Sequence, residues 1–77
     1  MEINILAFGQ IEEIIGKDSF TLSDVRDTEA LKSKLSDLYP EMNRIPYSIS
    51  VNKNIINGNH TLENGDEVAL LPPFSGG

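Results

Sequence analysis

The last residues of the chain, Ser75-Gly76-Gly77, carry an α-carboxylate on a stretch without bulky side chains. A carboxylate is a poor acyl donor, because its resonance and negative charge resist attack at carbon. A mixed anhydride with AMP replaces the oxide by a good leaving group, and a sulfur or nitrogen nucleophile can then take the acyl carbon. Because Gly76 and Gly77 have no Cβ, this end can also enter a narrow channel. Gly77 is therefore the candidate reactive position.

The rest of the sequence offers little catalytic material. The absence of cysteine excludes a disulfide, a thiolate zinc site and a cysteine nucleophile. A single histidine, His60, leaves almost no material for an imidazole metal cage or a Ser-His-Asp triad, and we expect no bound metal. No glycine-rich loop is followed by Lys and Ser or Thr. We therefore expect no bound cofactor, ATP consumption by a separate activating enzyme, and no catalysis by this chain alone.

Three sites with titratable side chains have simpler interpretations than catalysis. The adjacent acids Glu12 and Glu13 point about 100° apart on a helix, which is typical of a solvated face rather than an acid–base pair. Asp66-Glu67 indicates turn chemistry and a strand edge. His60, in a turn-rich stretch, is interpreted as solvated or hydrogen-bonded.

Charge and hydropathy limit the partners. The 77 residues have a formal charge of −6, from 12 acidic and 6 basic residues, which argues against nucleic acid because phosphate binding needs clustered Lys and Arg. The longest apolar run, residues 69–74, is far shorter than the roughly 20 residues of a membrane span. The N-terminus lacks the basic and apolar regions of a signal peptide. We expect a cytoplasmic protein that contacts no membrane.

The spacing of apolar residues predicts the strands and helices that carry the C-terminal end. Residues 2–8 alternate as a strand with Ile3, Ile5 and Ala7 on the core face, and a short helix over 10–15 ends at Gly16. A main helix, capped by Asp27 or Thr28 and ended by Pro40, is predicted to bury an apolar stripe of Ala30, Leu31, Leu35 and Leu38. Further strands are predicted over 19–23, 47–52, 55–56 and 67–71, with turns at Asn57-Gly58 and Asn64-Gly65.

This element order predicts one α+β domain over residues 1–77, with a mixed sheet of about five strands packed on one main helix plus a short helix. Residues 72–77 are expected to form a flexible C-terminal tail. Pro72 and Pro73 favour an extended exit from the last strand, and the four residues beyond them can reach about 13 Å.

The tail motif Pro72-Pro73-Phe74-Ser75-Gly76-Gly77, the turn and strand start of residues 64–68, and Phe8-Gly9-Gln10-Ile11 resemble the small subunit family of molybdopterin synthase, ubiquitin-like β-grasp sulfur carriers. The resemblance spans essentially the whole chain and is most specific in the tail. It implies that Gly77 is adenylated by an E1-like enzyme and converted to a thiocarboxylate by a sulfurtransferase.

The same resemblance implies a partner and a product. Docked in the large synthase subunit, as a heterotetramer, Gly77 would deliver sulfur to cyclic pyranopterin monophosphate for molybdenum cofactor biosynthesis. Gly76 would be its slender neighbour, and Pro72, Pro73, Phe74 and Ser75 would be tail residues that contact the partner's channel. Phe74 departs from the family, which more often has valine, and this is expected to alter packing in the channel rather than the chemistry.

Three other functions stay open. The thiazole-forming sulfur carrier of thiamin synthesis also ends in Gly-Gly, although it usually lacks the Pro-Pro step seen at Pro72-Pro73. A ubiquitin-like protein modifier would join Gly77 to lysines of its targets. A plain interaction domain would have an inert terminus.

A docking surface is predicted on the sheet face away from the main helix. If the first and last strands pair, as the β-grasp order implies, Leu6 and Phe8 lie beside Ala69 and Leu71 on this face. We call these four residues the outer patch. Exposed apolar patches of this kind are typical of partner-binding sites, and Ser48 and Ser50 are expected to limit the patch on one side.

Overall fold

The computed structural model describes residues 1–73. The predicted tail residues Phe74, Ser75, Gly76 and Gly77 lie outside the described residues. The elements in chain order are β1 (Glu2–Ala7), α1 (Gly9–Ile15), β2 (Ser19–Ser23), α2 (Thr28–Leu38), the 3-10 helix η1 (Pro40–Arg44), β3 (Ser48–Val51), β4 (Asn54–Ile55) and β5 (Glu67–Leu71). The α+β class predicted from the sequence is confirmed.

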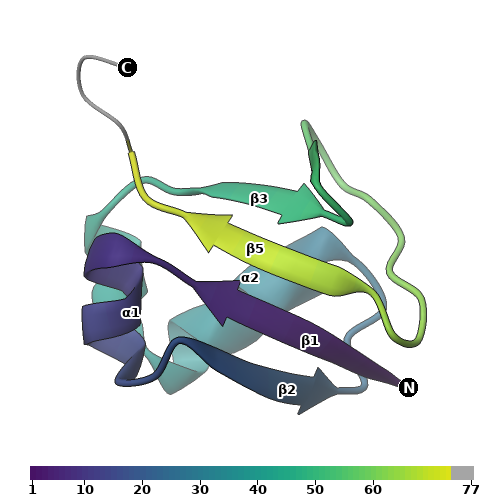
Figure 1. Ribbon diagram of the computed structural model, residues 1–77, viewed down its shortest axis with the longest axis horizontal. Coiled ribbons are helices and arrows are strands. Elements are labelled where there is room, and N and C mark those ends of the chain that lie inside the picture. The colour runs from purple at the N-terminus through teal and green to yellow at the C-terminus, as the bar shows by residue number, and fades with distance from the viewer. Residues whose placement is uncertain (74–77) are drawn as a thin grey trace.

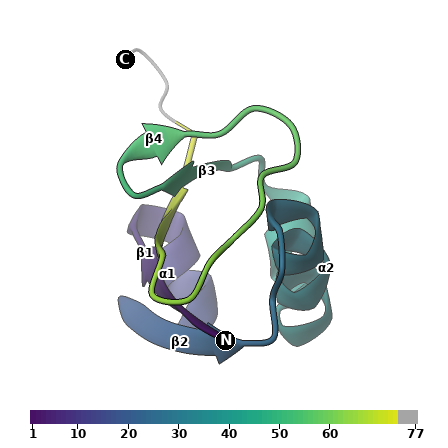
Figure 2. The ribbon, with the colours of Figure 1, turned by 90° about the vertical axis from the view of Figure 1, so that its right-hand side faces the viewer.

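The five strands form one mixed sheet in the order β2-β1-β5-β3-β4. The first and last strands, β1 and β5, run parallel side by side at its centre, as expected, with Ile5 opposite Val68. The strands β2, β3 and β4 join through antiparallel pairs. Helix α2 covers one face of the sheet, and α1 lies at the end where β1 and β5 finish (Figure 1). In the view turned by 90°, the opposite face carries no helix (Figure 2).

The core lies between the sheet and α2. Alternation places Ile3, Ile5 and Ala7 of β1 inside, each at most 1% exposed, as predicted. Leu31 and Leu35 of α2 are fully buried against them. The remaining buried apolar residues are Ile11, Ile15, Val25, Met42, Ile49, Val51, Leu62, Val68 and Leu70.

The main helix, α2, begins after one of the two capping residues predicted from the sequence. Asp27 is the N-cap, and its Oδ1 accepts a hydrogen bond of 2.8 Å from the amide of Ala30. The helix ends at Leu38, two residues before Pro40. The prediction that Leu38 belongs to the core is wrong, because it is 51% exposed. The core at this end is closed instead by Met42 of η1, which packs beside α2 and is 2% exposed.

Three smaller expectations need adjustment. The short helix ends at Gly16, which adopts φ +88° as predicted, but it begins at Gly9 rather than Gln10. In β3, Ser50 is buried as well as Ile49 and Val51, because β3 has neighbours on both sides. The edge strand covers Asn54–Ile55 instead of residues 55–56.

Within residues 1–73, no helix is long and apolar enough to cross a lipid bilayer.

Candidate partner-docking site

The root of the C-terminal tail is held against the start of α1. Strand β5 ends at Leu71, and Pro72 follows directly. A Cβ placed on Gly9 would lie 3.2 Å from Cγ of Pro72, so the proline ring sits in the space that a side chain would need. Gly9 also has φ +54°, a conformation that favours glycine. The tail therefore leaves the sheet beside the β1–α1 junction.

The outer face of the sheet carries an apolar row close to this root. Register places Leu6 opposite Ala69, Ala69 opposite Ser50, and Ser50 opposite Ile55. Directly paired residues point to the same face, so this row crosses four strands on the side away from α2. Leu6 and Ala69 are half-buried, whereas Ile55 is 56% exposed. Leu71, two residues further along β5 and on the same face, is also half-buried and lies opposite Ser48.

Ile55 is a member of this surface that the sequence pattern did not identify. Its strand has only two residues, so no alternation could assign it a face. Only the register between β3 and β4, which pairs Ile55 with Ser50, shows that Ile55 lies on the outer face. The expectation that Ser50 limits the apolar surface is therefore wrong. Ser50 lies between Ala69 and Ile55, within that surface.

Three residues of the outer patch lie where the sequence places them, and the fourth does not. Leu6, Ala69 and Leu71 lie on neighbouring strands, as predicted. Phe8 is not part of the strand, because β1 ends at Ala7 and Phe8 is the N-cap residue of α1. Its side chain is 46% exposed and lines a pocket together with Leu6. Phe8 thus extends the patch around the end of the strand.

The other half of the outer face is polar. Asn4 lies opposite both Thr21 and Glu67. Beyond them, Asn52 Nδ2 donates to Asp66 Oδ1 over 3.0 Å, and Asn52 Oδ1 accepts from the Glu67 amide over 3.0 Å. Because β1 and β5 are parallel, the apolar half is the one nearer the tail root.

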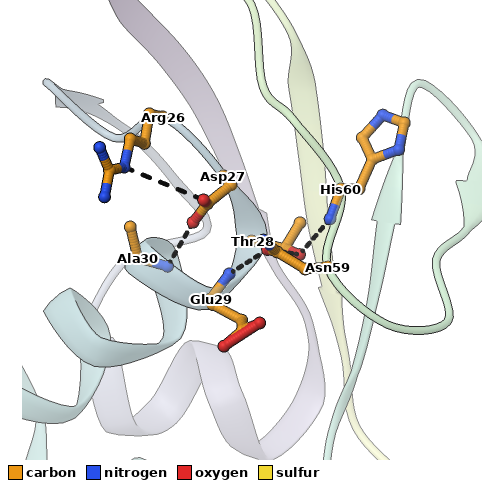
Figure 3. Close-up of polar contacts among 7 residues, drawn as sticks. All are labelled: Arg26, Asp27, Thr28, Glu29, Ala30, Asn59 and His60. Carbon is orange, nitrogen blue, oxygen red and sulfur yellow. Dashed lines mark hydrogen bonds and ion pairs between the residues drawn. The ribbon is translucent and has the colours of Figure 1, made fainter.

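The loop that carries His60 is anchored to the start of α2 (Figure 3). The hydroxyl of Thr28 accepts a 3.0 Å bond from the His60 amide and donates to Asn59 Oδ1 over 3.2 Å. Asn59 Oδ1 also accepts from the Glu29 amide over 3.0 Å. His60 thus contributes its backbone to this network. Its interpretation as an exposed loop residue is confirmed.

Hydrogen bonds to ionised carboxylates perturb two acids. The bond from the Ala30 amide, then one with Asn59, holds the pKa of Asp27 below its ordinary value. The bond from the Glu63 amide, then that from Asn52, lowers the pKa of Asp66. Both acids stabilise turns or caps. Among residues 1–73, no group of three or more His, Cys, Asp or Glu side chains could hold a metal ion.

The chain is similar to known proteins over nearly its whole length. The ThiS family model matches residues 5–77. A molybdopterin synthase sulfur carrier subunit of Dictyostelium discoideum is 32% identical over 83 residues, covering 99% of this chain and 96% of the relative.

Two solved structures extend this comparison to the fold. One chain in the complex of subunits 1 and 2 of molybdopterin-converting factor from Helicobacter pylori superposes with a TM-score of 0.76 and 25% identity, covering 100% of both chains. The small archaeal modifier protein 1 of Methanosarcina acetivorans gives a TM-score of 0.79 and 26% identity, covering 99% of this chain and 96% of that one. The predicted ubiquitin-like β-grasp fold is thereby confirmed. The chain belongs to the ThiS family, and its full-length relatives there include sulfur carrier subunits of molybdopterin synthase.

Proposed function

We propose that this protein is the sulfur carrier subunit of a molybdopterin synthase. The observation that carries the proposal is the full-length match to such subunits, with a family match that extends through residue 77. The apolar surface beside the tail root supports it, since a carrier must bind a partner next to the end that it delivers.

The chemistry at Gly77 proceeds in three steps: adenylation, acquisition of sulfur and transfer of sulfur. The carboxylate attacks the α-phosphate of ATP on a separate E1-like enzyme, and pyrophosphate leaves. A persulfide sulfur from a sulfurtransferase then attacks the acyl carbon and expels AMP, and a thiol cleaves the resulting acyl disulfide, which releases the thiocarboxylate and leaves that thiol in a disulfide with the sulfurtransferase. Finally, this sulfur attacks a side-chain carbon of cyclic pyranopterin monophosphate and displaces an oxygen leaving group, and water hydrolyses the resulting thioester, which restores the carboxylate of Gly77 and leaves the sulfur on the substrate; two such transfers supply the sulfurs of the dithiolene. The folded domain positions the tail, and Phe74, Ser75 and Gly76 contact the channel.

The proposed partner is the large synthase subunit, in a heterotetramer. The relevant support is the Helicobacter pylori structure, in which a chain of this fold is part of a complex of subunits 1 and 2. The outer patch, extended by Ile55, is the proposed contact.

The chemistry is tested by intact mass spectrometry and a reconstituted synthase assay. Protein purified from its native host should contain a fraction with one oxygen replaced by sulfur, localised to Gly77. Gly77→Ala, or one residue added after Gly77, should abolish sulfur transfer while leaving the circular dichroism spectrum unchanged. Wild-type rates from either variant would refute the proposal.

The docking surface is tested by affinity for the large subunit. Leu71→Asp and Phe8→Asp each place a charge in the contact, and each should weaken binding by about 2 kcal/mol or more, as expected for a hot spot. Thr21→Asp is the matched control, because it adds the same charge to the polar half of the same face. Equal affinities of all three variants would show that another surface is used.

A protein modifier is the second candidate, favoured by the likeness to the Methanosarcina acetivorans modifier protein. It predicts a ladder of conjugates in a denaturing blot that is lost on deletion of Gly76 and Gly77. The thiazole-forming carrier also stays open and predicts that a thiazole synthase, rather than the large synthase subunit, accepts sulfur from the thiocarboxylate. An inert terminus predicts that deleting Gly76 and Gly77 has no effect.

A further inference from the structure

A pocket of about 330 Å³ opens at the edge of the outer patch, where β1 ends and β2 begins. We call it the edge pocket. Leu6 and Phe8 supply apolar walls, while Glu12 of α1 and Asp18 place carboxylates around it; Ala7 and Ser19 complete it. The edge pocket therefore combines an apolar surface with two acids, beside the surface that carries the tail root.

Within residues 1–73, neither acid has a cation within ion-pair distance. Among the described residues, the ion pair within 4.0 Å is Arg26–Asp27, which involves neither Glu12 nor Asp18. Lys17, next to Asp18 in the sequence, has its Nζ 5.4 Å from the centre of the Phe20 ring. Two carboxylates thus border an exposed apolar wall without internal compensation. Bringing an apolar partner over them would desolvate both charges at a cost unless the partner supplies a cation.

We propose that the edge pocket binds an arginine side chain of the large synthase subunit. The inference rests on the proposed function, since it names a contact of that same partner. The aliphatic stem of an arginine can lie along Leu6, and its guanidinium can stack on the exposed Phe8 ring. The planar guanidinium has five donors, so it can bridge the Glu12 and Asp18 carboxylates, which the compact ammonium of a lysine matches less well.

The charge of the whole chain points the same way. At a formal charge of −6, the carrier attracts a partner surface of opposite sign. The edge pocket also sets the orientation of the bound partner, because it adjoins the outer patch through the shared residues Leu6 and Phe8. An arginine seated there would fix how the large subunit sits over the tail root.

The test measures affinity for the large subunit of the same organism at several salt concentrations. The double variant Glu12→Gln, Asp18→Asn should bind roughly tenfold more weakly or worse, with a shallower salt dependence. Glu63→Gln, Asp37→Asn is the matched control, because both are exposed, lie outside the edge pocket and change the formal charge from −6 to −4 in the same way. The control should bind within about twofold of the wild type.

A charge exchange identifies the occupant. Asp18→Arg should weaken binding, and a large subunit in which the contacting arginine is replaced by aspartate should restore it. Equal affinities of the edge-pocket variant and the matched control, or a loss that no arginine exchange restores, would overturn the inference while leaving the proposed function intact. If the wild-type carrier does not bind the large subunit, the proposed function itself fails.

Discussion

At the scale of single residues, Thr28 joins two parts of the chain that are far apart in sequence. Its side chain is 2% exposed, and its hydroxyl both accepts from the His60 amide and donates to Asn59. Its own amide donates to the His60 carbonyl over 3.0 Å. One hydroxyl thus satisfies a loop amide that packing would otherwise leave without a partner.

Thr28→Val keeps the shape of this side chain and removes its hydrogen bonds. The free energy of unfolding should fall by about 1–3 kcal/mol, because the partly buried His60 amide loses its acceptor. Urea denaturation followed by circular dichroism measures the change. Thr28→Ser, which retains the hydroxyl, should recover most of the stability, and equal losses from both variants would contradict this account.

Asp66 makes stability depend on pH in a defined direction. Hydrogen bonds from the Glu63 amide and from Asn52 lower its pKa in the folded state below the ordinary value of 3.8. Its contribution to the free energy of unfolding is therefore fully present above the pKa that Asp66 has in the unfolded state. The contribution is lost as the pH falls through the pKa that Asp66 has in the folded state. Asp66→Asn should be less stable than the wild type at pH 7, and the difference should shrink below about pH 4. Thermal unfolding at pH 7 and pH 3 tests this, and a constant difference would contradict it.

At the scale of elements, α2 shows that apolar spacing does not by itself define the core. Leu35 and Leu38 belong to one sequence stripe, yet Leu35 is fully buried and Leu38 is 51% exposed. Leu35→Ala should lower the free energy of unfolding by about 2–5 kcal/mol, whereas Leu38→Ala should change it by about 0.5 kcal/mol or less. Urea denaturation in added sucrose, which strengthens the folded state of both variants, measures each value. Comparable losses would place Leu38 in the core after all.

The sequence predicted elements better than their junctions. Alternation and helical spacing identified the faces of β1 and α2 because Ile3, Ile5, Leu31 and Leu35 are each surrounded by regular structure. The exposure of Leu38 depends on where η1 closes the core, and that is set by tertiary packing rather than by local pattern.

In the candidate site, too, positions within regular strands were predicted correctly and positions at junctions were not. The expected pairing of the first and last strands correctly placed Leu6, Ala69 and Leu71 on one face. Phe8 lies past the strand end, and Ile55 lies on a two-residue strand, so neither position could be fixed by alternation. The edge pocket needs the spatial approach of Glu12 and Asp18 to the end of β1, which no linear spacing encodes. The roles of Gly77 and the other tail residues stay predictions.

At the scale of the whole molecule, the parallel central strands separate the two ends of the chain. Strands β1 and β5 run in the same direction, so Met1 precedes one end of the sheet and Pro72 follows the other. Figure 1 shows the N-terminus at the end of the sheet opposite α1. The polar half of the outer face, with Asn4 and Glu67, lies towards the N-terminal end, and the apolar half lies towards the tail root.

This separation predicts opposite effects for tags at the two termini. A short affinity tag before Met1, which is 46% exposed, is remote from the outer patch and the tail root, so affinity for the large subunit should stay within about twofold of the untagged protein. In the proposed function Gly77 is adenylated and enters the partner's channel, so the same tag after Gly77 should abolish sulfur transfer while the fold persists. Calorimetric binding and the synthase assay, run on both tagged forms, measure these effects. Loss of binding with the N-terminal tag would place the docking surface at the polar end of the sheet, and activity of the C-terminally tagged form would remove Gly77 from the reaction.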